Sequence, residues 1–444
     1  MLKIFGRRIQ LQIPQLVVLG FAALILLGAL VLTLPICTAE GVRTPFVDAL
    51  FTSTTSVCVT GLVVRDTGSY WSSFGHGVIL LLIQVGGLGI ISIAASFAMI
   101  AGLKIGLFQR NAMQENIGAQ QTGGIVKLTG FLLKTTLAIE FIGAALLSPV
   151  LIRDYGWGKG IWMSIFTSIS AFCNAGIDLF GIRAPYSSLT TYADNIWINV
   201  TIMALIVVAG LGFLTWDDIR AHRFRLKKYK MQSKVILLTS ALLIILPAVL
   251  FFFFEFSSLP MKQRILASLF QSVTTRTAGM NTMDLDAMTE PGKMLMIFLM
   301  LIGGSPGSTA GGMKTTTFAV LIACAAAVFR KRDSAQLFGR RIGHDVVAAA
   351  ATLFVMYVTL CVGGAMVISL YEGLPLLTCM YETASAVATV GLTLGITPGL
   401  GLLSKIILIV LMYMGRVGGL TLIYAALSPK KQMGKLPLDR ITVG

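Results

Sequence analysis

Phe51-Thr-Ser-Thr-Thr-Ser-Val-Cys-Val-Thr-Gly61 is the most informative segment of this 444-residue chain, because the chain repeats its pattern three more times. Each copy opens with an aromatic residue, continues through a Ser/Thr-rich segment and ends in a glycine. The other copies are Phe166-Thr-Ser-Ile-Ser-Ala-Phe-Cys-Asn-Ala-Gly176, Phe270-Gln-Ser-Val-Thr-Thr-Arg-Thr-Ala-Gly279 and Tyr381-Glu-Thr-Ala-Ser-Ala-Val-Ala-Thr-Val-Gly391. The four glycines are about 100 to 115 residues apart, so four copies of one structural unit fill the chain.

The composition is too apolar for a soluble protein. Hydrophobic residues make up 56% of the chain and charged residues 12%, and the mean hydropathy is +0.84. These values predict a polytopic membrane protein. The net charge of +16 could suggest nucleic-acid binding, but the basic residues lie in short segments between apolar runs, which argues against it. The six cysteines have no metal-ligand spacing and are expected to be free thiols.

Two apolar stretches long enough to span a membrane flank each glycine phrase. They fall near residues 14–34, 76–103, 125–150, 194–216, 233–255, 292–329 (interrupted), 346–371 and 402–427. The segment that precedes each phrase is too short to span, so it must enter and leave by the same face. Pro45, Pro260 and Pro375 open three of these segments and suit the first turn of a helix.

The sequence therefore predicts an all-α polytopic membrane protein with eight transmembrane helices and four re-entrant pore helices. Each unit should read helix, short pore helix, extended strand, helix, an M1-P-M2 arrangement around one pseudo-fourfold pore. We expect the four repeats at residues 1–110, 111–222, 223–340 and 341–444, the last with a C-terminal tail.

Basic residues set the expected orientation. Segments predicted to be cytoplasmic hold 22 of the 35 basic residues, which places both termini in the cytoplasm and opens the pore loops outward. These residues are Lys3, Arg7, Arg8, Lys104, Arg110, Lys127, Arg220, Arg223, Arg225, Lys227, Lys228, Lys230, Lys234, Arg330, Lys331, Arg332, Arg340, Arg341, Lys430, Lys431, Lys435 and Arg440. The dense stretch 220–234 fits either topology and lipid headgroups or a dock for a cytosolic partner.

Four non-helical segments at membrane depth must line a shared cavity, because lipid cannot satisfy their backbone groups. The partly negative C-terminal end of each pore helix would favour a cation there, and backbone carbonyls could replace the water shell of a potassium ion. Glycine supplies the unusual backbone angles that such a strand needs. The predicted filter strands are Cys58-Val59-Thr60-Gly61, Cys173-Asn174-Ala175-Gly176, Arg276-Thr277-Ala278-Gly279 and Ala388-Thr389-Val390-Gly391.

A glycine-rich run interrupts the sixth apolar stretch and cannot stay helical. It comprises Gly303, Gly304, Ser305, Pro306, Gly307, Ser308, Thr309, Ala310, Gly311 and Gly312. We expect a polar gating loop beneath the filter, the alternative being a kink for close helix packing. Arg416 should face the pore as an electrostatic barrier, unless it snorkels or pairs with a carboxylate. Lys314 fits a gate residue or a snorkelling lysine equally well.

Other charged residues give weaker indications. Glu140 should pair with polar groups of a neighbouring helix, and Glu382 could attract cations to the mouth. His76, His222 and His344 share no metal-binding spacing, so no metal beyond transported potassium is expected. No catalytic motif occurs in the sequence, so the chain is not expected to be an enzyme.

The phrases also resemble a known family. Together with Asp48-Ala-Leu-Phe, Arg276-Thr-Ala-Gly-Met-Asn281 and Gly303-Gly-Ser-Pro-Gly-Ser-Thr-Ala-Gly-Gly-Met-Lys314, they are similar to the Trk/Ktr/HKT superfamily of potassium transporters over essentially all 444 residues. The first repeat begins almost at the N-terminus, as in Ktr-type (KtrB) membrane subunits. Asn174 and Arg276 make the filter less regular than in tetrameric potassium channels.

This resemblance implies potassium uptake across a bacterial plasma membrane, with sodium as a candidate activator. It also implies a homodimer, whose C-terminal tail 436–444 could dock on the neighbouring protomer. A cytosolic nucleotide-binding RCK ring of the KtrA type would control opening and carry the nucleotide. Glycine at all four filter positions goes with potassium selectivity in the family. The alternatives are an alternating-access cation or solute carrier, a sodium-selective relative and a membrane scaffold without transport.

Overall fold

The structure is a computed structural model of the chain, and it describes residues 2–4, 7–9, 12–90, 92–93, 95, 106–117, 123–223 and 225–426. Five basic residues used to predict the orientation lie outside the described residues: Lys104, Lys430, Lys431, Lys435 and Arg440. Lys3, Arg7 and Arg8 are described and belong to the N-terminal hairpin. The tail 436–444, which was predicted to dock on a neighbouring protomer, also lies outside them.

Among the described residues, four long helices are each apolar enough to cross a membrane as a single helix. They are α1 (Ile13–Leu32), α7 (Ile125–Tyr155), α11 (Met231–Leu250), which continues into the π-helical turn η5 (Phe251–Glu255), and α15 (His344–Glu372). They coincide with the first predicted span of each pair. Large apolar side chains such as Leu26, Leu27 and Leu30 are exposed on α1, as expected for a helix that faces lipid.

Four shorter helices lead to the glycine phrases. They are α2 (Phe46–Cys58), α8 (Trp157–Cys173), α12 (Met261–Thr274) and α16 (Leu376–Val387), and their 12 to 17 residues are too few to span hydrocarbon. Pro45, Pro260 and Pro375 were predicted in the first turn of these helices. Each is instead the N-cap residue, immediately before its helix. Their fixed φ and missing amide hydrogen still favour a helix start at the next residue.

The second helix of every unit is interrupted, whereas the sequence predicted an interruption only in the third. The helices are α4 (Ser73–Leu88); α9 (Ile196–Gly210) followed by α10 (Phe213–His222) at 93°; α13 (Glu290–Leu301) followed by α14 (Thr315–Phe329); and α17 (Leu402–Val417) followed by α18 (Gly419–Ala426). The stretches predicted as spans at 76–103, 194–216 and 402–427 therefore each contain a helix break that the sequence analysis did not predict. Gly89, Gly212 and Gly418 stand at these breaks with φ of 83°, 84° and 89°, a region that favours glycine.

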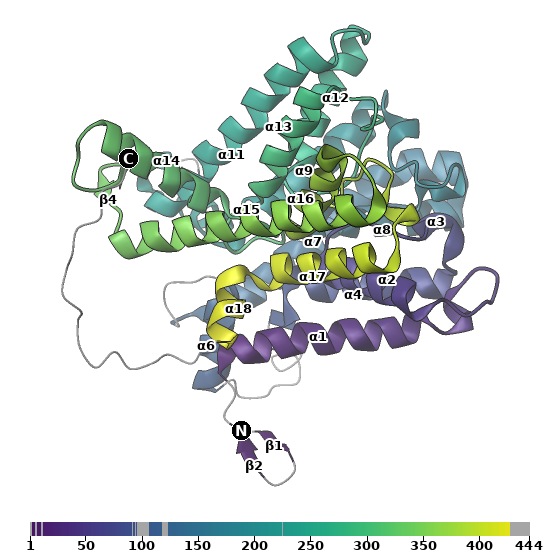
Figure 1. The fold of residues 1–444 in the computed structure, drawn as a ribbon, viewed down its shortest axis with the longest axis horizontal. Coiled ribbons are helices and arrows are strands. Elements are labelled where there is room, and N and C mark those ends of the chain that lie inside the picture. Colours follow the sequence, from purple (N-terminus) through teal and green to yellow (C-terminus); the bar gives the residue numbers. More distant parts are fainter. Residues whose placement is uncertain are drawn as a thin grey trace.

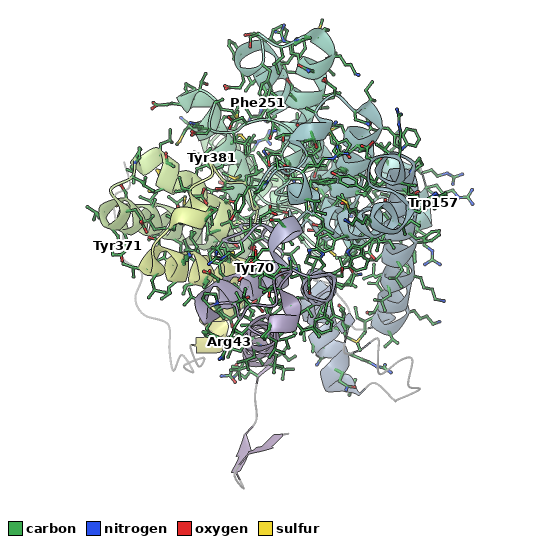
Figure 2. The ribbon with its side chains drawn as sticks, turned by 90° about the vertical axis from the view of Figure 1, so that its right-hand side faces the viewer. Arg43, Tyr70, Trp157, Phe251, Tyr371 and Tyr381 are labelled. Carbon is green, nitrogen blue, oxygen red and sulfur yellow. The ribbon has the colours of Figure 1, made fainter. Side chains whose placement is uncertain are left out.

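The units close into a ring. Each pore helix packs against the second helix of the preceding unit, and the pairs are α8 with α4, α12 with α9, α16 with α13 and α2 with α17. Figure 2 shows the result, because the sequence colours follow one another around the molecule from purple through blue and teal to yellow-green. The fourth unit thus packs on the first, and the glycine phrases converge at the centre.

Several short strands and helices lie outside the four repeated units or connect their helices. Two antiparallel hairpins, β1 (Leu2–Ile4) with β2 (Arg7–Ile9) and β3 (Gln336–Leu337) with β4 (Arg340–Arg341), were not part of the all-α prediction. Figure 1 shows both at the periphery, with β1 and β2 projecting from the body. The remaining elements are η1 (Pro35–Cys37), α3 (Thr67–Tyr70), α6 (Leu107–Ile117), η2 (Phe180–Ile182), η3 (Thr190–Tyr192), η4 (Leu226–Lys228) and η6 (Thr397–Gly399).

Candidate ion pathway

The backbone of the four glycine phrases follows one unusual pattern. The terminal glycines Gly61, Gly176, Gly279 and Gly391 have φ of 103°, 64°, 77° and 95°. The residues two positions earlier, Val59, Asn174, Thr277 and Thr389, also have positive φ, between 52° and 68°. Side chains make such angles costly, and they persist where the surroundings fix them, often at functional sites. Fourfold repetition of this pattern indicates a common function.

The four glycines surround one axis at very short range. A Cβ atom added to any of them would lie within 3.0 Å of the carbonyl oxygen that precedes the next glycine. The contacting pairs are Gly61 with Ala175, Gly176 with Ala278, Gly279 with Val390 and Gly391 with Thr60, which closes the ring. Backbone carbonyls from all four units therefore meet in one closed ring, in which no side chain fits at the glycine positions.

Hydroxyl groups in the last turns of the pore helices hold the strands in place. Thr55 Oγ1 accepts a hydrogen bond from the Gly61 amide over 2.9 Å, and Ser385 Oγ accepts one from Gly391 over 2.9 Å. In the other two units the hydroxyls donate instead, from Ser170 to the Ile177 carbonyl and from Thr274 to the Met280 carbonyl. Each strand is thus fixed by a side chain of its own pore helix.

A second set of hydroxyls ties each pore helix to the long helix of the same unit. Ser53 donates to the Ile25 carbonyl, Ser168 to Glu140, Ser272 to Ile244 and Thr383 to Cys361, over 2.6 to 2.9 Å. These serines and threonines therefore have a structural role, whereas the buried hydroxyls of Thr60, Thr277 and Thr389 in the strands have no hydrogen-bond partner among the described residues.

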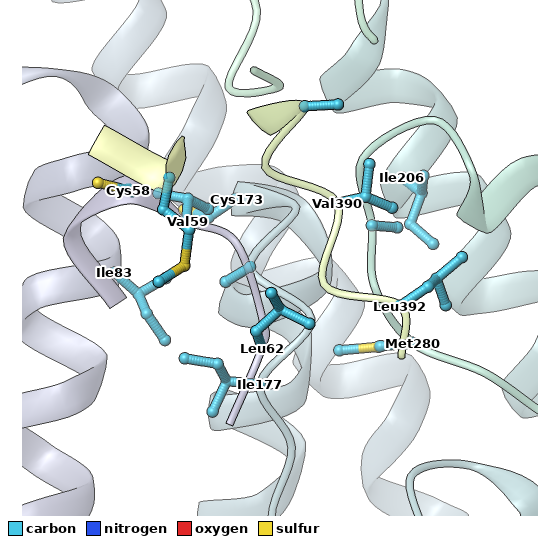
Figure 3. Close-up of a cluster of buried hydrophobic side chains, with 14 of the residues drawn as sticks. Cys58, Val59, Leu62, Ile83, Cys173, Ile177, Ile206, Met280, Val390 and Leu392 are labelled. Carbon is cyan, nitrogen blue, oxygen red and sulfur yellow. The ribbon is translucent and has the colours of Figure 1, made fainter. Parts of the chain in front are cut away.

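The residue after each glycine anchors the strand on its outer side. Leu62, Ile177, Met280 and Leu392 are all buried within one hydrophobic cluster. Figure 3 shows these side chains together with those of Val59 and Val390 around the strands. Apolar packing outside and hydroxyl anchors at the helix ends leave the backbone carbonyls as the groups available to the axis.

A cavity of about 480 Å³ lies on one side of the ring, and all four glycines line it. Asp66, Asp178, Asp284 and Asp286 also line this outer cavity, so its walls carry negative charge. Burial raises the pKa of the Asp178 carboxyl to about 6; a hydrogen bond from the Phe180 amide opposes the rise and the nearby Asp66 adds to it. The mouth therefore offers carboxylates to an approaching cation.

A second cavity, of about 210 Å³, lies at the glycine-rich loop 303–312 and the helix breaks. Lys314 and Arg416 line it together with Gly89, Gly307 and Gly418. A cation that leaves the ring on this side would meet two basic side chains.

The glycine-rich loop lies directly against the strands. Asn174 Nδ2 donates to Thr309 Oγ1 over 3.3 Å, and the Thr309 hydroxyl donates to the Phe172 carbonyl over 3.1 Å. On the opposite strand, a Cβ added to Gly311 would collide with the Thr389 hydroxyl. The loop thus bridges the second and fourth strands at the end of the passage that is remote from the outer cavity.

Arg416 and Lys314 stabilise the loop in this position. The Arg416 guanidinium donates to the Thr309 carbonyl and to two carbonyls at the C-terminal end of α4, those of Gly86 and Gly87. Lys314 Nζ donates to the Ala310 carbonyl over 2.7 Å and to that of Gly311 over 3.3 Å. Neither cation forms a salt bridge among the described residues, so both act on backbone carbonyls.

All four predicted strands converge, but their first positions differ. Cys58 and Cys173 are the last residues of α2 and α8, Ala388 follows α16, and Arg276 is 5% exposed with one guanidinium nitrogen unpartnered. The contacts between neighbouring strands involve the glycine of each quartet and the carbonyl of the residue before it, and the first positions take no part in them.

Two predictions about acidic residues have different outcomes. Glu140 accepts hydrogen bonds from Gln84 Nε2 of α4 over 3.1 Å, so the predicted pairing with a neighbouring helix is confirmed. Glu382 is fully buried and accepts from the hydroxyls of Thr393 and Thr397 and the amide of Leu394. Glu382 therefore positions the segment after the fourth strand. The suggestion that it attracts cations at the mouth was wrong, because its carboxylate is not exposed there. The six cysteines are free.

Sequence reasoning missed two groups of residues. The hydroxyl anchors Thr55, Ser170 and Ser385 recur six positions before their glycines, and Thr274 five positions before its own, a spacing that could have identified them. The breaks at Gly89, Gly212 and Gly418 also had a signal, because each lies within three residues of another glycine.

Comparison with known proteins identifies the family of this chain. The TrkH family profile, described as "Cation transport protein", matches residues 17–434. The potassium/sodium uptake protein NtpJ of Enterococcus hirae is 42% identical over 429 residues, which cover 95% of this chain and 94% of the relative. The Ktr system potassium uptake protein B of Bacillus subtilis is 35% identical over 437 residues, covering 97% and 96%.

The fold also has a solved counterpart. The potassium transporter TrkH from Vibrio parahaemolyticus superposes with a TM-score of 0.74 and 20% identity, over 96% of this chain and 87% of that one. This similarity confirms a helical polytopic fold, and the family consists of transport proteins and not enzymes. The closed ring of four carbonyl-lined strands thus lies in a chain that belongs to the TrkH family of cation transport proteins.

Proposed function

We propose that this protein takes up potassium through a channel-like pore with a filter of backbone carbonyls. The observation that carries the proposal is the ring in which each glycine abuts the carbonyl that precedes the next one. A dehydrated monovalent cation needs several oxygen ligands at once, and four strands can supply them from all sides. The names of both sequence relatives, which mention potassium uptake, support this ion.

In this proposal the chain crosses a bacterial plasma membrane eight times, as four M1-P-M2 repeats at 1–110, 111–222, 223–340 and 341–444. The termini lie in the cytoplasm because most basic residues lie on that side. The outer cavity with its aspartates then faces the exterior and collects cations. The second cavity, with Lys314 and Arg416, faces the cytoplasm.

The loop 303–312 is the gate in this mechanism. It lies across the inner end of the filter strands, and Arg416 ties it to α4. Opening requires the loop to leave the strands, which a cytosolic nucleotide-binding RCK ring of a partner subunit would drive in a homodimer of this chain. Sodium would act as an activator and not as the main cargo.

The test is growth of a potassium-uptake-deficient bacterium at limiting potassium, with this chain and a Ktr-type ring subunit. The native chain should rescue growth, and Gly61→Ser or Gly391→Ser should lose rescue or shift uptake toward sodium, because a Cβ would collide with Ala175 or Thr60. Gly77→Ser is the matched control, since its Cβ would meet nothing within 4 Å. Equal rescue by the filter variants and the control would instead favour an alternating-access carrier.

The name of the Enterococcus hirae relative includes sodium as well as potassium, so sodium uptake is the second candidate function. Uptake of ²²Na⁺ and ⁸⁶Rb⁺ by the purified chain in proteoliposomes separates the two. Rubidium uptake that tenfold excess sodium leaves unchanged would support potassium, and preferential sodium uptake would contradict it.

A further inference from the structure

A basic cavity of about 840 Å³ lies between the α10–α11 connection and the β3–β4 hairpin, and it shares no lining residue with the two cavities of the ion pathway. Lys227, Lys228, Lys230, Lys234 and Arg340 line it, with Asp217 as the single acidic residue. None of these five basic side chains forms a salt bridge with a residue that the structure describes. The cavity is thus an uncompensated cluster of positive charge, and the ion pathway makes no use of it.

The geometry of the cavity favours an anion further. It lies at the partly positive start of α11, where the side chain of the N-cap residue Lys230 makes no hydrogen bond to the first backbone amides. Lys234 Nζ donates to the Lys227 carbonyl over 2.8 Å, and this bond holds its ammonium group in the cavity. The Ser233 hydroxyl and the Lys230 amide are engaged by Asp218, which fixes the backbone of the turn.

An apolar groove of about 450 Å³ adjoins the basic cavity. The two share Met231 and Gln232, and the groove continues along α11, α14 and α15 past Val235, Val320 and Leu353. Figure 1 shows β4 and the start of α15 at the same end of the molecule, beside α14. Because α11 and α15 are membrane-spanning candidates, this groove follows helices that face hydrocarbon. A basic cavity and an apolar groove therefore meet at the expected depth of the lipid headgroups.

We propose that this composite site binds an anionic phospholipid, with the phosphate in the basic cavity and an acyl chain in the groove. A free phosphate would use only the cavity, and an uncharged apolar ligand would use only the groove. A lipid with a net negative headgroup uses both, and clustered basic residues at a cytoplasmic membrane surface attract such headgroups. The site lies on two connections, between the second and third units and between the third and fourth. It is independent of the proposed transport activity.

The test uses the full-length protein purified in detergent, titrated with phosphatidylglycerol or phosphatidylcholine and observed by native mass spectrometry. The native chain should bind phosphatidylglycerol at least tenfold more tightly than phosphatidylcholine. The variant Lys227→Gln/Lys228→Gln/Arg340→Gln should lose this preference, because each basic residue near a lipid surface contributes roughly 1 kcal/mol, a factor of about five. Glycerol phosphate at the same concentration should not compete.

The control variant is Arg43→Gln/Lys159→Gln/Lys262→Gln, which removes the same charges from exposed positions near the starts of the pore helices α2, α8 and α12, outside the lining of the basic cavity. It should keep the preference. A second variant, Ala349→Trp, fills the apolar groove and should weaken both lipids, with folding checked by size-exclusion chromatography. If Ala349→Trp does not fold, the charge variants decide alone.

Four results would overturn the proposal. Equal binding of the two lipids would remove the headgroup preference, and equal losses in the test and control variants would place it elsewhere. Full competition by glycerol phosphate would assign the cavity to a soluble anion. Binding to dissociated monomers alone would also contradict it, because the groove would then be covered by a second copy of the chain.

Discussion

Asn174 Nδ2 lies 3.3 Å from Thr309 Oγ1 and joins the second filter strand directly to the glycine-rich loop, 135 residues away in sequence. The same Thr309 presents its carbonyl to Arg416 and its hydroxyl proton to the Phe172 carbonyl. One residue of the loop thus contacts the strand, the end of a pore helix and the last broken helix. Displacement of the loop must break these bonds together, so their strength bears directly on gating.

Asn174→Ala should raise potassium uptake in the absence of the ring subunit. A buried neutral hydrogen bond contributes about 1 kcal/mol, so its loss should shift the closed–open equilibrium about fivefold. Rubidium flux into proteoliposomes measures the change. Thr309→Val should have a larger effect, because it also loses the bond to the Phe172 carbonyl, and adding Asn174→Ala to it should change the flux little further. Ser308→Ala is the control, because its hydroxyl bonds only the Ser305 carbonyl. Identical flux in Asn174→Ala and Ser308→Ala would refute the coupling.

Arg416→Gln should raise basal flux more than Arg416→Lys does. The glutamine variant loses both the positive charge beside the inner cavity and the bonds to Thr309, Gly86 and Gly87. The lysine variant keeps the charge, but a single ammonium group lacks the fork that spans two segments. Flux and thermal stability, measured for the native protein and both variants, separate the effect of the positive charge on conduction from the effect of the hydrogen bonds that hold the loop. A fall in flux at native stability would show that Arg416 does not oppose conduction.

Thr55→Val should reduce the preference for potassium over sodium. The variant leaves the Gly61 amide without its 2.9 Å partner, so the strand loses about 1 kcal/mol of positioning and its carbonyls can adapt to a smaller ion. Ser385→Ala should act similarly through Gly391. Ser56→Ala serves as the control, since its hydroxyl bonds the Thr52 carbonyl of its own helix. Reversal potentials under mixed-ion conditions give the ratio; unchanged ratios in both test variants would contradict the anchor role.

Uptake at limiting potassium should fall as external pH drops below about 6, because the Asp178 carboxyl, with its pKa raised to about 6, becomes neutral there. Above this pH the carboxylate attracts cations, and a unit charge about 8 Å away in water contributes about 0.5 kcal/mol, close to a twofold change in local concentration. Asp178→Asn should therefore show low uptake both above and below pH 6. Asp284→Asn removes one exposed mouth charge and should keep the pH dependence. A pH profile that survives in Asp178→Asn would disprove the assignment.

Much of this arrangement could be predicted from the sequence because the information is local. The pore helices follow from short segments opened by Pro45, Pro260 and Pro375, and the strands follow from glycines at matching positions. The break at 303–312 was evident because ten consecutive residues disfavour a helix. The breaks at Gly89, Gly212 and Gly418 were missed: each lies near another glycine, but neighbouring glycines also occur within continuous apolar helices, and the positive φ values show which of them end a helix.

Contacts between distant segments could not be predicted. The sequence places Glu382 on the fourth pore helix, from where its carboxylate could have faced the mouth. The structure instead buries it against Thr393, Thr397 and Leu394. The sequence left open whether Arg416 faces the pore, snorkels or finds a carboxylate. In the structure Arg416 donates to backbone carbonyls. Because every residue has a carbonyl, no residue type in the sequence could have identified these partners.

The sequence by itself determined the membrane class, the four repeats and the chemistry of each strand, because hydropathy, repetition and glycine geometry are properties of neighbouring residues. The tertiary structure alone decided that the fourth unit packs on the first, that Asn174 meets Thr309, and that a basic cavity adjoins an apolar groove. These features depend on how helices separated by about 100 residues or more pack together. That packing is set by the summed burial of whole faces and not by any one motif.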